Sequence, residues 1–394
     1  MTRRPGAVAE AVTDVETGTV TDVETGTVTD AVTGADAVTD ARAVPDAGTG
    51  AEPQADAAAP APAATPLTVA PARPSAVAPG TPPALFTLGE AMAMAAATGP
   101  GPFATGAPLR LGWAGAEATV AIGVSRLGHR AAWTGRVGED AAGEMVLAGL
   151  RAEGVDVEGA RREPAVPTGL MLRERRTADR LRVTYYRASL AGSRLAPEDL
   201  DEDRLAGARI LHVTGITPAL GPTARAAVER AVRVARAAGV TVSFDVNHRE
   251  RLWSRAEAAE VLARLLPFTD IVFAGPEEAA LFVPDGEPAE AARALTRLGP
   301  GQAVLKLGAQ GALVVADGVT HVQRAVPVTA VDPVGAGDAF VSGYLAAVLD
   351  GSPVPERLRL AALCGAFAVS VPGDWEGLPR RAELDLLAAQ DISR

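Results

Sequence analysis

The residues best suited to chemistry lie in one loop, residues 332–340, with the sequence DPVGAGDAF. Its two glycines let the backbone approach a ligand closely, and the apolar run that follows predicts a helix. The backbone N–H groups of Gly335, Ala336 and Gly337 would then converge at the positive end of that helix and form an anion hole for a transferring phosphoryl group. Asp338 would stand in the first helical turn, where a carboxylate can take the proton of an attacking hydroxyl. The simpler interpretation is that Asp338 only stabilises the N-terminus of the helix, as acidic residues commonly do.

A second candidate is Lys306, the only lysine of the chain; the rest of its 37 basic residues are arginines. Lys306 opens the segment KLGAQG, residues 306–311, which lies between two predicted strands. A compact ammonium, together with the close backbone approach that Gly308 and Gly311 allow, suits the phosphates or the adenine side of a nucleotide. The alternative is that Lys306 has no special role and is a lysine by chance in an arginine-rich chain.

The elements that must position these residues alternate along the chain from residue 85 onward, as apolar strand-like runs and helical stretches rich in alanine and arginine. This alternation predicts an α/β fold, in which right-handed crossovers build a mostly parallel sheet covered by helices. The predicted strands include 86–88, 210–214, 240–244, 271–273, 303–307 and 313–316, and the predicted helices include 223–238 and 256–266.

One stretch differs from this pattern. Residues 168–187 alternate in extended fashion around the polar turn 177–180, which indicates a β-hairpin with no helix to cover it. We expect this hairpin, with part of 105–137, to form a small β lid through which copies of the chain could associate.

The first 84 residues differ from the rest in composition and charge. They contain the repeat TDVETGTV at 13–20 and 21–28 and then become rich in Ala, Pro, Thr and Asp. Eleven acidic residues and four arginines give them a net charge of −7, which leaves −4 of the total of −11 to the other 310 of the 394 residues. Such a segment cannot bury enough apolar surface to offset the entropy of ordering its backbone. We therefore expect a disordered acidic tail at 1–84 and one folded domain at 85–394, and leave open a docking or solubility role for the tail.

The composition of the whole chain excludes several classes of function. A net charge of −11 offers no basic stripe for nucleic acid or an anionic membrane, so a small molecule is the expected partner. The chain contains no apolar run of about eighteen residues and no apolar core near its start, as a membrane span or a secretion signal would require. Cys364 is the only cysteine, so no disulfide can form within the chain, which fits a reducing compartment. We expect a cytoplasmic protein.

The loop around Asp338 resembles the second signature of the ribokinase (PfkB) family of sugar kinases, and residues 306–311 resemble the nucleotide-side turn of that family. Further stretches are similar to the members that act on 2-keto-3-deoxygluconate: YYRASLAGS at 185–193, LHVTGITPAL at 211–220, DVNHR at 245–249 and GDWEG at 373–377. The resemblance extends from about residue 85 to the C-terminus and leaves the tail unexplained. It implies a ribokinase-like α/β fold and an ATP-dependent enzyme.

The resemblance also implies a role for individual residues. Asp338 would be the catalytic base beside the anion hole, and the sugar acid would be contacted by Gly115, Tyr185, Arg187, Arg249 and Asp374. A planar guanidinium directly after a buried strand, as at Arg249, can give a carboxylate two parallel hydrogen bonds. The alternative for Arg187 and Arg249 is that they are ordinary exposed arginines.

On the nucleotide side, the resemblance places ATP beside Lys306, Gly308 and Gly311. Glu278, in the segment GPEE, would organise Mg²⁺ through water, and no residue is assigned as a direct metal ligand. Phosphoryl transfer itself requires a cation that bridges the terminal phosphates. ATP and Mg²⁺ are therefore the expected cofactors.

Five positions depart from the family pattern: Ala114, Thr119, Met171, His248 and Gly275 replace a glycine, an asparagine, two tyrosines and a polar residue. Met171 matters most, because the lost tyrosine hydroxyl could relax the sugar specificity or shift it toward a related aldonate. None of these changes involves Asp338.

Three functions remain open. The first is a kinase that phosphorylates 2-keto-3-deoxygluconate at its terminal hydroxyl, and we expect this one. The second is a kinase of the same fold that acts on a neutral sugar such as fructose or ribose. The third is a sugar-binding protein without catalysis, and the presence of Asp338 with its glycines argues against it.

Overall fold

The computed structural model describes residues 82–177 and 180–387. The predicted tail, 1–84, lies outside the described residues except at 82–84, and its predicted disorder stays a prediction. The first element of the fold is strand β1 (Leu85–Leu88), which begins where the composition of the chain changes.

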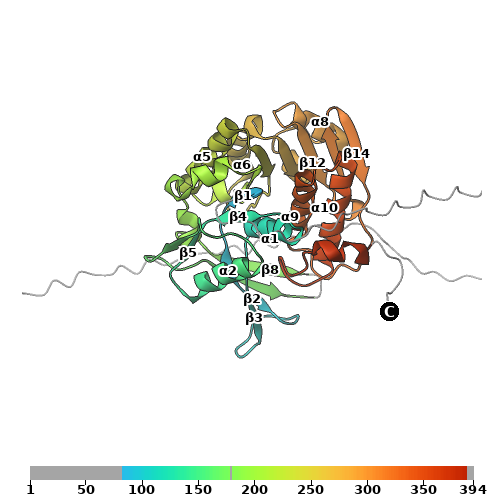
Figure 1. Ribbon diagram of the computed structural model, residues 1–394. Coiled ribbons are helices and arrows are strands. Elements are labelled where there is room, and N and C mark those ends of the chain that lie inside the picture. The colour runs from blue at the N-terminus through green and yellow to red at the C-terminus, as the bar shows by residue number, and fades with distance from the viewer. Residues whose placement is uncertain (1–81, 178–179, 388–394) are drawn as a thin grey trace, which may run out of the picture. The chain divides into compact units, whose positions relative to one another are not determined.

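A sheet of eight strands forms the centre of the fold (Figure 1). Its strand order is β14-β13-β12-β11-β10-β9-β1-β4; the strands from β4 to β12 run parallel, and β13 and β14 are added antiparallel at one edge. The other strands of this sheet are β4 (Ala131–Thr134), β9 (Ile210–Thr214), β10 (Thr241–Asp245), β11 (Ile271–Ala274), β12 (Gln302–Lys306), β13 (Ala312–Ala316) and β14 (Val319–Gln323). The predicted mostly parallel α/β fold is confirmed.

Helices cover both faces of this sheet, so its central strands are apolar on both sides. One face packs against α1 (Ala116–Arg126), α2 (Ala141–Ala152), α9 (Ala336–Leu349) and α10 (Val354–Val369). The other face packs against α5 (Pro222–Ala238), α6 (Arg255–Leu262) and α8 (Pro288–Thr296). The short helices are α3 (Glu202–Ala206), α4 (Ile216–Ala219) and α7 (Pro276–Ala279). None of the helices described is both long and apolar enough to span a bilayer.

Helix α5 illustrates how local sequence sets an element. It starts with Pro222, whose fixed φ suits a first helical position, and it ends before Gly239, which has the left-handed φ of 72°. Between them, small alanines and valines recur at helical spacing and face the sheet. The helix predicted at 223–238 is therefore confirmed.

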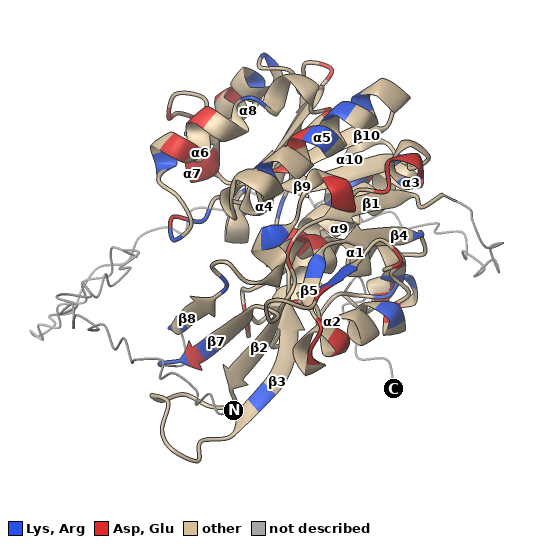
Figure 2. Ribbon diagram, turned by 90° about the vertical axis from the view of Figure 1, so that its left-hand side faces the viewer, with Lys and Arg blue, Asp and Glu red and all other residues tan. Residues whose placement is uncertain are grey.

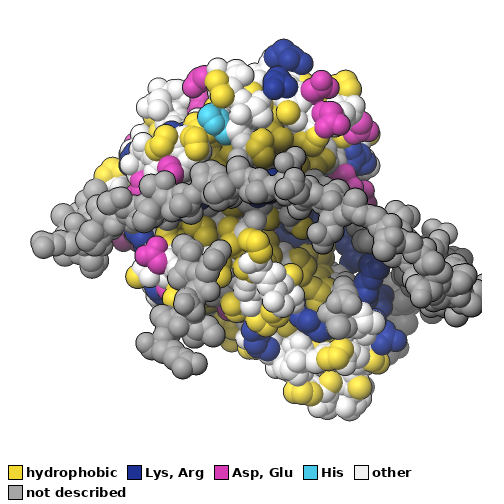
Figure 3. Space-filling view, turned by 90° about the vertical axis from the view of Figure 1, so that its right-hand side faces the viewer, with side chains coloured by type: hydrophobic (Ala, Val, Ile, Leu, Met, Phe, Trp, Pro, Cys, Tyr) yellow, Lys and Arg dark blue, Asp and Glu magenta, His cyan; other side chains and the backbone are white. Residues whose placement is uncertain are grey.

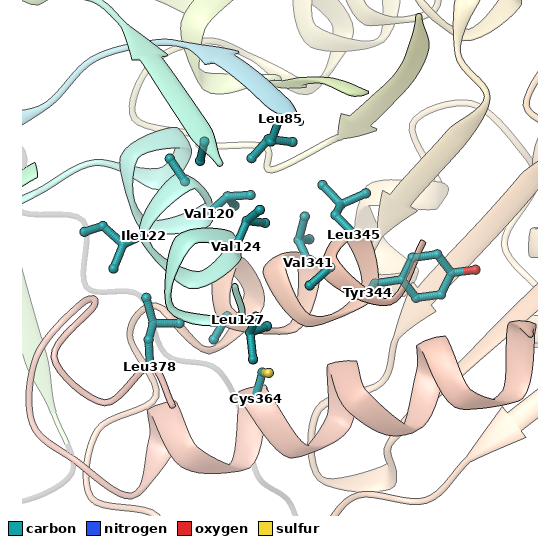
Figure 4. Packing of buried hydrophobic residues seen from close by; sticks show 14 of the residues in the cluster. Leu85, Val120, Ile122, Val124, Leu127, Val341, Tyr344, Leu345, Cys364 and Leu378 are labelled. Carbon is teal, nitrogen blue, oxygen red and sulfur yellow. The ribbon is translucent and has the colours of Figure 1, made fainter. Parts of the chain in front are cut away.

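Helix α9, which directly follows the loop at 332–335, lies at the centre of one of the hydrophobic core clusters. Figure 4 shows Val341 and Leu345 of α9 on the side of Val124 of α1, Tyr344 pointing away from α1, and Cys364 of α10 beside Leu127. The Tyr344 ring meets Phe273 edge-on at 5.3 Å between centroids, and its hydroxyl donates a 2.7 Å hydrogen bond to Gln302. These contacts attach α9 to β11 and β12 of the sheet.

A second, smaller sheet has the order β3-β2-β7-β8 (Figure 2). Its strands are β2 (Met92–Ala97), β3 (Leu109–Ala114), β7 (Leu170–Arg175) and β8 (Leu181–Tyr186). Strands β7 and β8 pair antiparallel and confirm the hairpin predicted at 168–187, although its turn residues 178–179 lie outside the described residues. Strands β5 (Arg136–Gly138) and β6 (Arg161–Glu163) form a separate two-stranded sheet.

Of the range 105–137, part of which was expected to join the hairpin, strand β3 lies in the small sheet with it. Residues 116–126 form helix α1, which is buried along most of its length, and 131–134 form strand β4 of the large sheet. The strand that completes the small sheet is β2, with the sequence MAMAAA. Alanine and methionine favour helices, so only pairing with β3 and β7 makes this segment a strand.

The two faces of the small sheet differ, because side chains alternate along each strand. Met94, Met171 and Val183 belong to an apolar cluster on one face. On the other face Leu111 and Tyr186 are 68% and 52% exposed, and hydrophobic side chains reach the surface at the lower end of Figure 3. Association of copies through this sheet stays a prediction.

Two glycines, one in α9 and one in α10, should respond in opposite ways to substitution by alanine. A Cβ on Gly343 would come within 2.8 Å of the Cys364 sulfur and 2.9 Å of the Ala361 backbone, whereas a Cβ on Gly365 would find its nearest atom at 3.6 Å. We expect Gly343→Ala to lower the free energy of unfolding by about 1–3 kcal/mol through overpacking. Gly365→Ala should raise it by up to about 1 kcal/mol, the helix-propensity difference between the two residues. Chemical denaturation of both variants tests this; equal effects would contradict the helix contact.

Candidate active site

A cleft of about 850 Å³ opens at the carboxyl ends of the parallel strands, between them and the small sheet. Its walls are one face of the small sheet, the start of α1, the segments that follow β10 and β11, the end of β12 and the loop that leads into α9. Ligands of open α/β sheets commonly bind at this edge. The cleft therefore brings together residues from most of the predicted motifs.

The predicted loop-to-helix motif is present at one end of the cleft. Gly335 has φ of 75° and precedes the first residue of α9, Ala336. A Cβ on Gly335 would lie 1.9 Å from the backbone oxygen of Asp374, so no other residue fits there. Gly335, Gly337 and Asp338 line the cleft. Ala336 does not line it, and its N–H donates a long hydrogen bond of 3.4 Å to the Pro333 oxygen, whereas the other N–H groups of a first helical turn have no acceptors within the helix. The arrangement suits an anion.

Asp338 lies in the first turn of α9, as predicted, and its carboxylate accepts a hydrogen bond of 3.3 Å from the side-chain amide of Asn247. Its pKa is raised to about 7, mainly by burial and further by the Asp245 carboxylate, while Arg249 and Lys306 oppose the increase. A carboxylate with a pKa near neutrality can both accept a proton and release it.

Lys306 ends strand β12 with its ammonium in the cleft. The ammonium donates hydrogen bonds of 2.8 and 2.7 Å to the two carboxylate oxygens of Asp245, a residue that is 1% exposed. Burial opposes the charge of Lys306, but the carboxylates of Asp245 and Glu278 outweigh it and raise the pKa. Lys306 therefore stays protonated.

Gly308 and Gly311 lie in the turn between β12 and β13 and, within the described structure, do not line the cleft. Both have positive φ, 56° and 104°, and the N–H of Leu307 donates to the Gly311 oxygen at 2.8 Å. The turn explains these glycines without a ligand, and their contact with ATP stays a prediction.

Glu278, in helix α7, also lines the cleft. Its carboxylate accepts hydrogen bonds from the backbone N–H groups of Gly275, at 2.7 Å, and His248, at 3.0 Å. The carboxylate is therefore fixed in place and joins the segments after β10 and β11.

The residues expected to contact the sugar all line the cleft: Gly115, Tyr185, Arg187, Arg249 and Asp374. Arg187 already forms an ion pair with the buried Glu90, and its guanidinium lies 5.3 Å from the Tyr185 ring centroid. Arg249 makes only a 3.3 Å hydrogen bond to the backbone oxygen of His248 and no ion pair with another described residue. Of these two arginines, Arg249 is the one whose charge is not already paired.

Asp374 belongs to a buried ion cluster. Arg173 of β7, whose side chain is 5% exposed, donates to Asp374 at 3.0 Å and also pairs with Asp332. Burial raises the pKa of Asp374 to about 6, although the Arg173 charge opposes this. The cluster fastens the small sheet to the loop before α9.

Several charged residues of the cleft were not predicted. Glu90 and Arg173 are the main ones, and Glu117 accepts hydrogen bonds from the Thr214 and Thr217 hydroxyls at 2.7 and 2.6 Å. Asp245, also not predicted as a site residue, does not line the cleft itself and is buried beside Lys306. Burial raises the pKa of both Glu90 and Glu117. Glu90 and Asp245 lie just after the predicted strands 86–88 and 240–244. A polar residue at the end of a strand could have indicated a site residue in both cases. Nothing in the hairpin pattern distinguished Arg173 from its neighbouring arginines.

The five departures from the family pattern, at 114, 119, 171, 248 and 275, all line this cleft. The side chains of Thr119 and Met171 are 1% and 5% exposed, so each occupies interior volume beside the ligand space. These changes therefore leave the charged side chains of the cleft themselves in place, although His248 and Gly275 contact one of them, Glu278, through their backbone N–H groups.

Comparison with known proteins identifies the family, because residues 83–381 match the pfkB family of carbohydrate kinases. The chain belongs to this family. The pfkB kinase is 36% identical to the 2-dehydro-3-deoxygluconokinase of Thermoproteus tenax over 307 residues, which are 77% of this chain and 93% of that one. It is also 36% identical to the enzyme of the same name from Bacillus subtilis, over 77% and 95% of the two chains.

Solved structures agree with this assignment. A crystal structure of 2-dehydro-3-deoxygluconokinase from Thermotoga maritima is similar with a TM-score of 0.72 and 28% identity, over 77% of the pfkB kinase and 97% of that chain. A structure from E. coli, described as ribokinase II in complex with ATP and Mg²⁺, has the same TM-score and identity, over 77% and 98% of the two chains. The ribokinase-like fold expected from the motifs is thus confirmed.

Arg173 provides a stability test of the site. Without its guanidinium, Arg173→Met should lose about 3–5 kcal/mol of unfolding free energy, because buried carboxylates remain unpaired. The pKa of Asp374, already about 6 against an ordinary 3.8, should rise further, so folding favours its protonated form and stability falls as the pH rises. The loss should therefore be larger at about pH 8 than at about pH 5.

Arg110→Met is the matched control on the same sheet. Arg110 is 44% exposed and stands 3.8 Å from Glu376, so its loss should cost at most about 1 kcal/mol. Denaturation of both variants at the two pH values tests this prediction. If the two variants lost equal stability, or if the loss in Arg173→Met did not depend on pH, the buried ion cluster would be contradicted.

Proposed function

We propose that this pfkB kinase transfers the terminal phosphoryl group of ATP to the terminal hydroxyl of 2-keto-3-deoxygluconate. The observation that supports this substrate is the position of Arg249, in one cleft with Asp338 and Gly335 and without an ion-pair partner among the described residues. A planar guanidinium with unused donors suits a planar carboxylate. The similarity to enzymes named for this sugar acid supports the same conclusion.

The donors of the cleft fit a nucleotide that carries a divalent cation. The first-turn N–H groups of α9 and the Lys306 ammonium suit phosphate oxygens, and the fixed Glu278 carboxylate suits water molecules around Mg²⁺. No group of three or more acidic, histidine or cysteine residues in the described chain could hold a metal by itself. When bound, MgATP supplies the phosphoryl group and the charge that neutralises the phosphates.

The residues of the chain would then divide the work as follows. Asp338 takes the proton of the attacking hydroxyl, and the backbone N–H groups of Gly335, Ala336 and Gly337 stabilise charge on the transferring group. Arg249, with Gly115 and Asp374, orients the sugar acid. The small sheet, which carries Tyr185 and Arg187, covers the cleft and limits access of water to the reacting atoms.

Asp338→Asn tests the base. Asparagine keeps the size of the side chain but cannot accept the proton, so kcat should fall about 10²-fold or more while ATP still binds. In the unaltered enzyme, kcat/KM for the sugar should rise with pH through about 7, because the active form of Asp338 is the ionised one. That limb should disappear from any residual activity of the variant.

Asp317→Asn is the control for this substitution, since Asp317 lies in the turn between β13 and β14 and has φ of 50°, which asparagine tolerates. It should leave kcat and the pH profile unchanged. An Asp338→Asn enzyme with full activity would remove Asp338 from the mechanism.

Arg249→Met tests the substrate class. Losing the charged donors should reduce kcat/KM for 2-keto-3-deoxygluconate about ten- to a hundredfold, the equivalent of ~1.5–3 kcal/mol of charged hydrogen bonding. Activity on a neutral sugar such as fructose or ribose should change far less, and Arg249→Lys should recover only part of the loss, because a point charge offers no fork. Assays at about pH 9 keep Asp338 ionised after the change in nearby charge.

Arg255→Met is the control, because Arg255 also lines the cleft but donates to the backbone oxygen of Glu277 at 3.0 Å. Its effect should be the same on acidic and neutral sugars. A preference of the unaltered enzyme for a neutral sugar, or an equal loss on both classes in Arg249→Met, would refute the carboxylate contact and leave a general sugar kinase.

A further inference from the structure

The ion pair between Asp245 and Lys306 lies at the wall of the cleft, where Lys306 lines the cleft and Asp245 is buried beside it. Asp245 ends β10, Lys306 ends β12, and β11 lies between them in the sheet. Both oxygens of Asp245 accept from the ammonium, and the described residues give that ammonium no third acceptor. The ammonium lies 3.7 Å from where a Cβ on Gly337 would stand. One N–H bond is therefore left beside the expected anion hole.

The other charges near this pair restrict where the ammonium could go. Lys306 is influenced by three carboxylates, those of Asp245, Glu278 and Asp338. The oxygens of Glu278 are already held by the backbone N–H groups of His248 and Gly275. Asp338 accepts only the 3.3 Å hydrogen bond from Asn247. If Asp245 released the ammonium, Glu278 and Asp338 would be the carboxylates left to bind it, and Asp338 is the one of the two with fewer hydrogen-bond donors.

Such a pairing would remove the base. A carboxylate that is bound to an ammonium loses much of its affinity for a proton. The same movement would take the positive charge away from Gly337 and the phosphoryl site. Asp245 is thus placed to keep the Lys306 ammonium away from the Asp338 carboxylate.

We propose that Asp245 is a positioning residue that acts through Lys306: it holds the ammonium beside Gly337, where one N–H bond faces the transferring phosphoryl group, and it prevents the ammonium from pairing with Asp338. This inference rests on the proposed kinase function and deepens it. In the transfer, the hydroxyl oxygen of the sugar bonds to the terminal phosphorus, and the bond from that phosphorus to the bridging oxygen breaks and leaves ADP with the electron pair. The hydroxyl proton passes to Asp338, and Lys306 keeps its own.

The charged groups around Asp338 change its pKa in the directions that this role of Asp245 requires. Asp245 of β10 and Glu117 of α1 raise its pKa, whereas Arg249 and Lys306 lower it. A released Lys306 would lower it further, and a missing Lys306 would raise it. Substitutions of the two partners should therefore move the pH profile in opposite directions.

The first experiment is the pH dependence of kcat/KM in a double-mutant cycle. Asp245→Asn should move the acid limb to lower pH by about one unit or more, and Lys306→Met should move it to higher pH by a similar amount. In the Lys306→Met background, Asp245→Asn should move the limb clearly less than it does alone, because no ammonium is left to release; an equal shift in both backgrounds would mean that Asp245 acts on Asp338 directly and would overturn the proposal. Each single variant should lower kcat more than it changes the KM for the sugar. Shifts in the same direction, or none, would overturn the proposal.

Asp270→Asn is the matched control. Asp270 precedes β11 at the opposite end of the sheet, where it pairs with Arg236 at 2.8 Å and accepts from the Val242 N–H at 2.7 Å. Its loss should lower stability but leave the acid limb where it is. A residue with a merely structural role would behave like Asp270.

The second experiment uses the unaltered protein and does not depend on whether the variants fold. Because Lys306 is the only lysine, labelling with ¹⁵N-lysine gives one side-chain nitrogen resonance. That resonance should shift when ADP, Mg²⁺ and aluminium fluoride, which imitate the transferring group, are bound. No shift, under conditions in which calorimetry shows that the nucleotide is bound, would overturn the contact with the phosphoryl group.

The two experiments also separate this proposal from the proposed function. If a sugar panel shows another substrate, the pH cycle is run with that sugar. If no sugar is phosphorylated, the proposed function fails, and the nitrogen resonance still tests the pair: Asp245→Asn should lower the pKa of Lys306, because its burial remains while its main counter-charge is lost. An unchanged Lys306 titration would then refute the role of Asp245.

Discussion

The arrangement of the cleft depends on how carboxylates are kept in a space from which water is largely excluded. Like charges at short range disfavour ionisation, and burial adds to the effect. In the cleft and directly behind its wall, three carboxylates have a cation directly bound: Glu90 has Arg187, Asp245 has Lys306, and Asp374 has Arg173. Asp338 has only the Asn247 amide. Glu117 also lacks a cation and has only the hydroxyls of Thr214 and Thr217, but Asp338 is the one of the two that stands in the first turn of α9, where neighbouring charges can set the proton affinity of a general base.

The same constraint determines how the small sheet is attached. Arg173 of β7 pairs with Asp332 and Asp374, which lie outside the small sheet, and the exposed Arg251, which follows β10, donates to the backbone oxygen of Val183 in β8. The apolar cluster beneath the sheet is small and rich in methionine. Charged contacts to the cleft therefore contribute much of what holds this sheet in place, and a ligand that alters those charges would also alter the attachment of the sheet.

The anion hole depends, in addition, on close packing of the backbone. Helix α9 contacts α10 at Gly343, where even a methyl group would overlap with Cys364, and its first turn begins at Gly335 against the backbone of Asp374. Such contacts leave the helix no alternative position. Fixed donors that need no reorganisation are the most effective way to stabilise developing charge.

The sequence by itself determined the alternation of strands and helices, the β7–β8 hairpin, and the loop that places Asp338 in the first turn of α9. These features depend on neighbours within one or two turns of chain, which periodicity and glycine positions report directly. Strand β2 could not be predicted in this way, because its composition favours a helix. Only its pairing with β3 and β7 holds the segment in an extended conformation.

The tertiary structure alone decided which charges meet. Asp245 and Lys306 are 61 residues apart and come together because β10 and β12 end at the same edge of the sheet. It also assigned Glu90 to Arg187 and placed Gly308 and Gly311 in a turn outside the cleft. An ion pair depends on distances of a few ångströms between segments distant in the chain, and a local pattern of residue types contains no information about that distance.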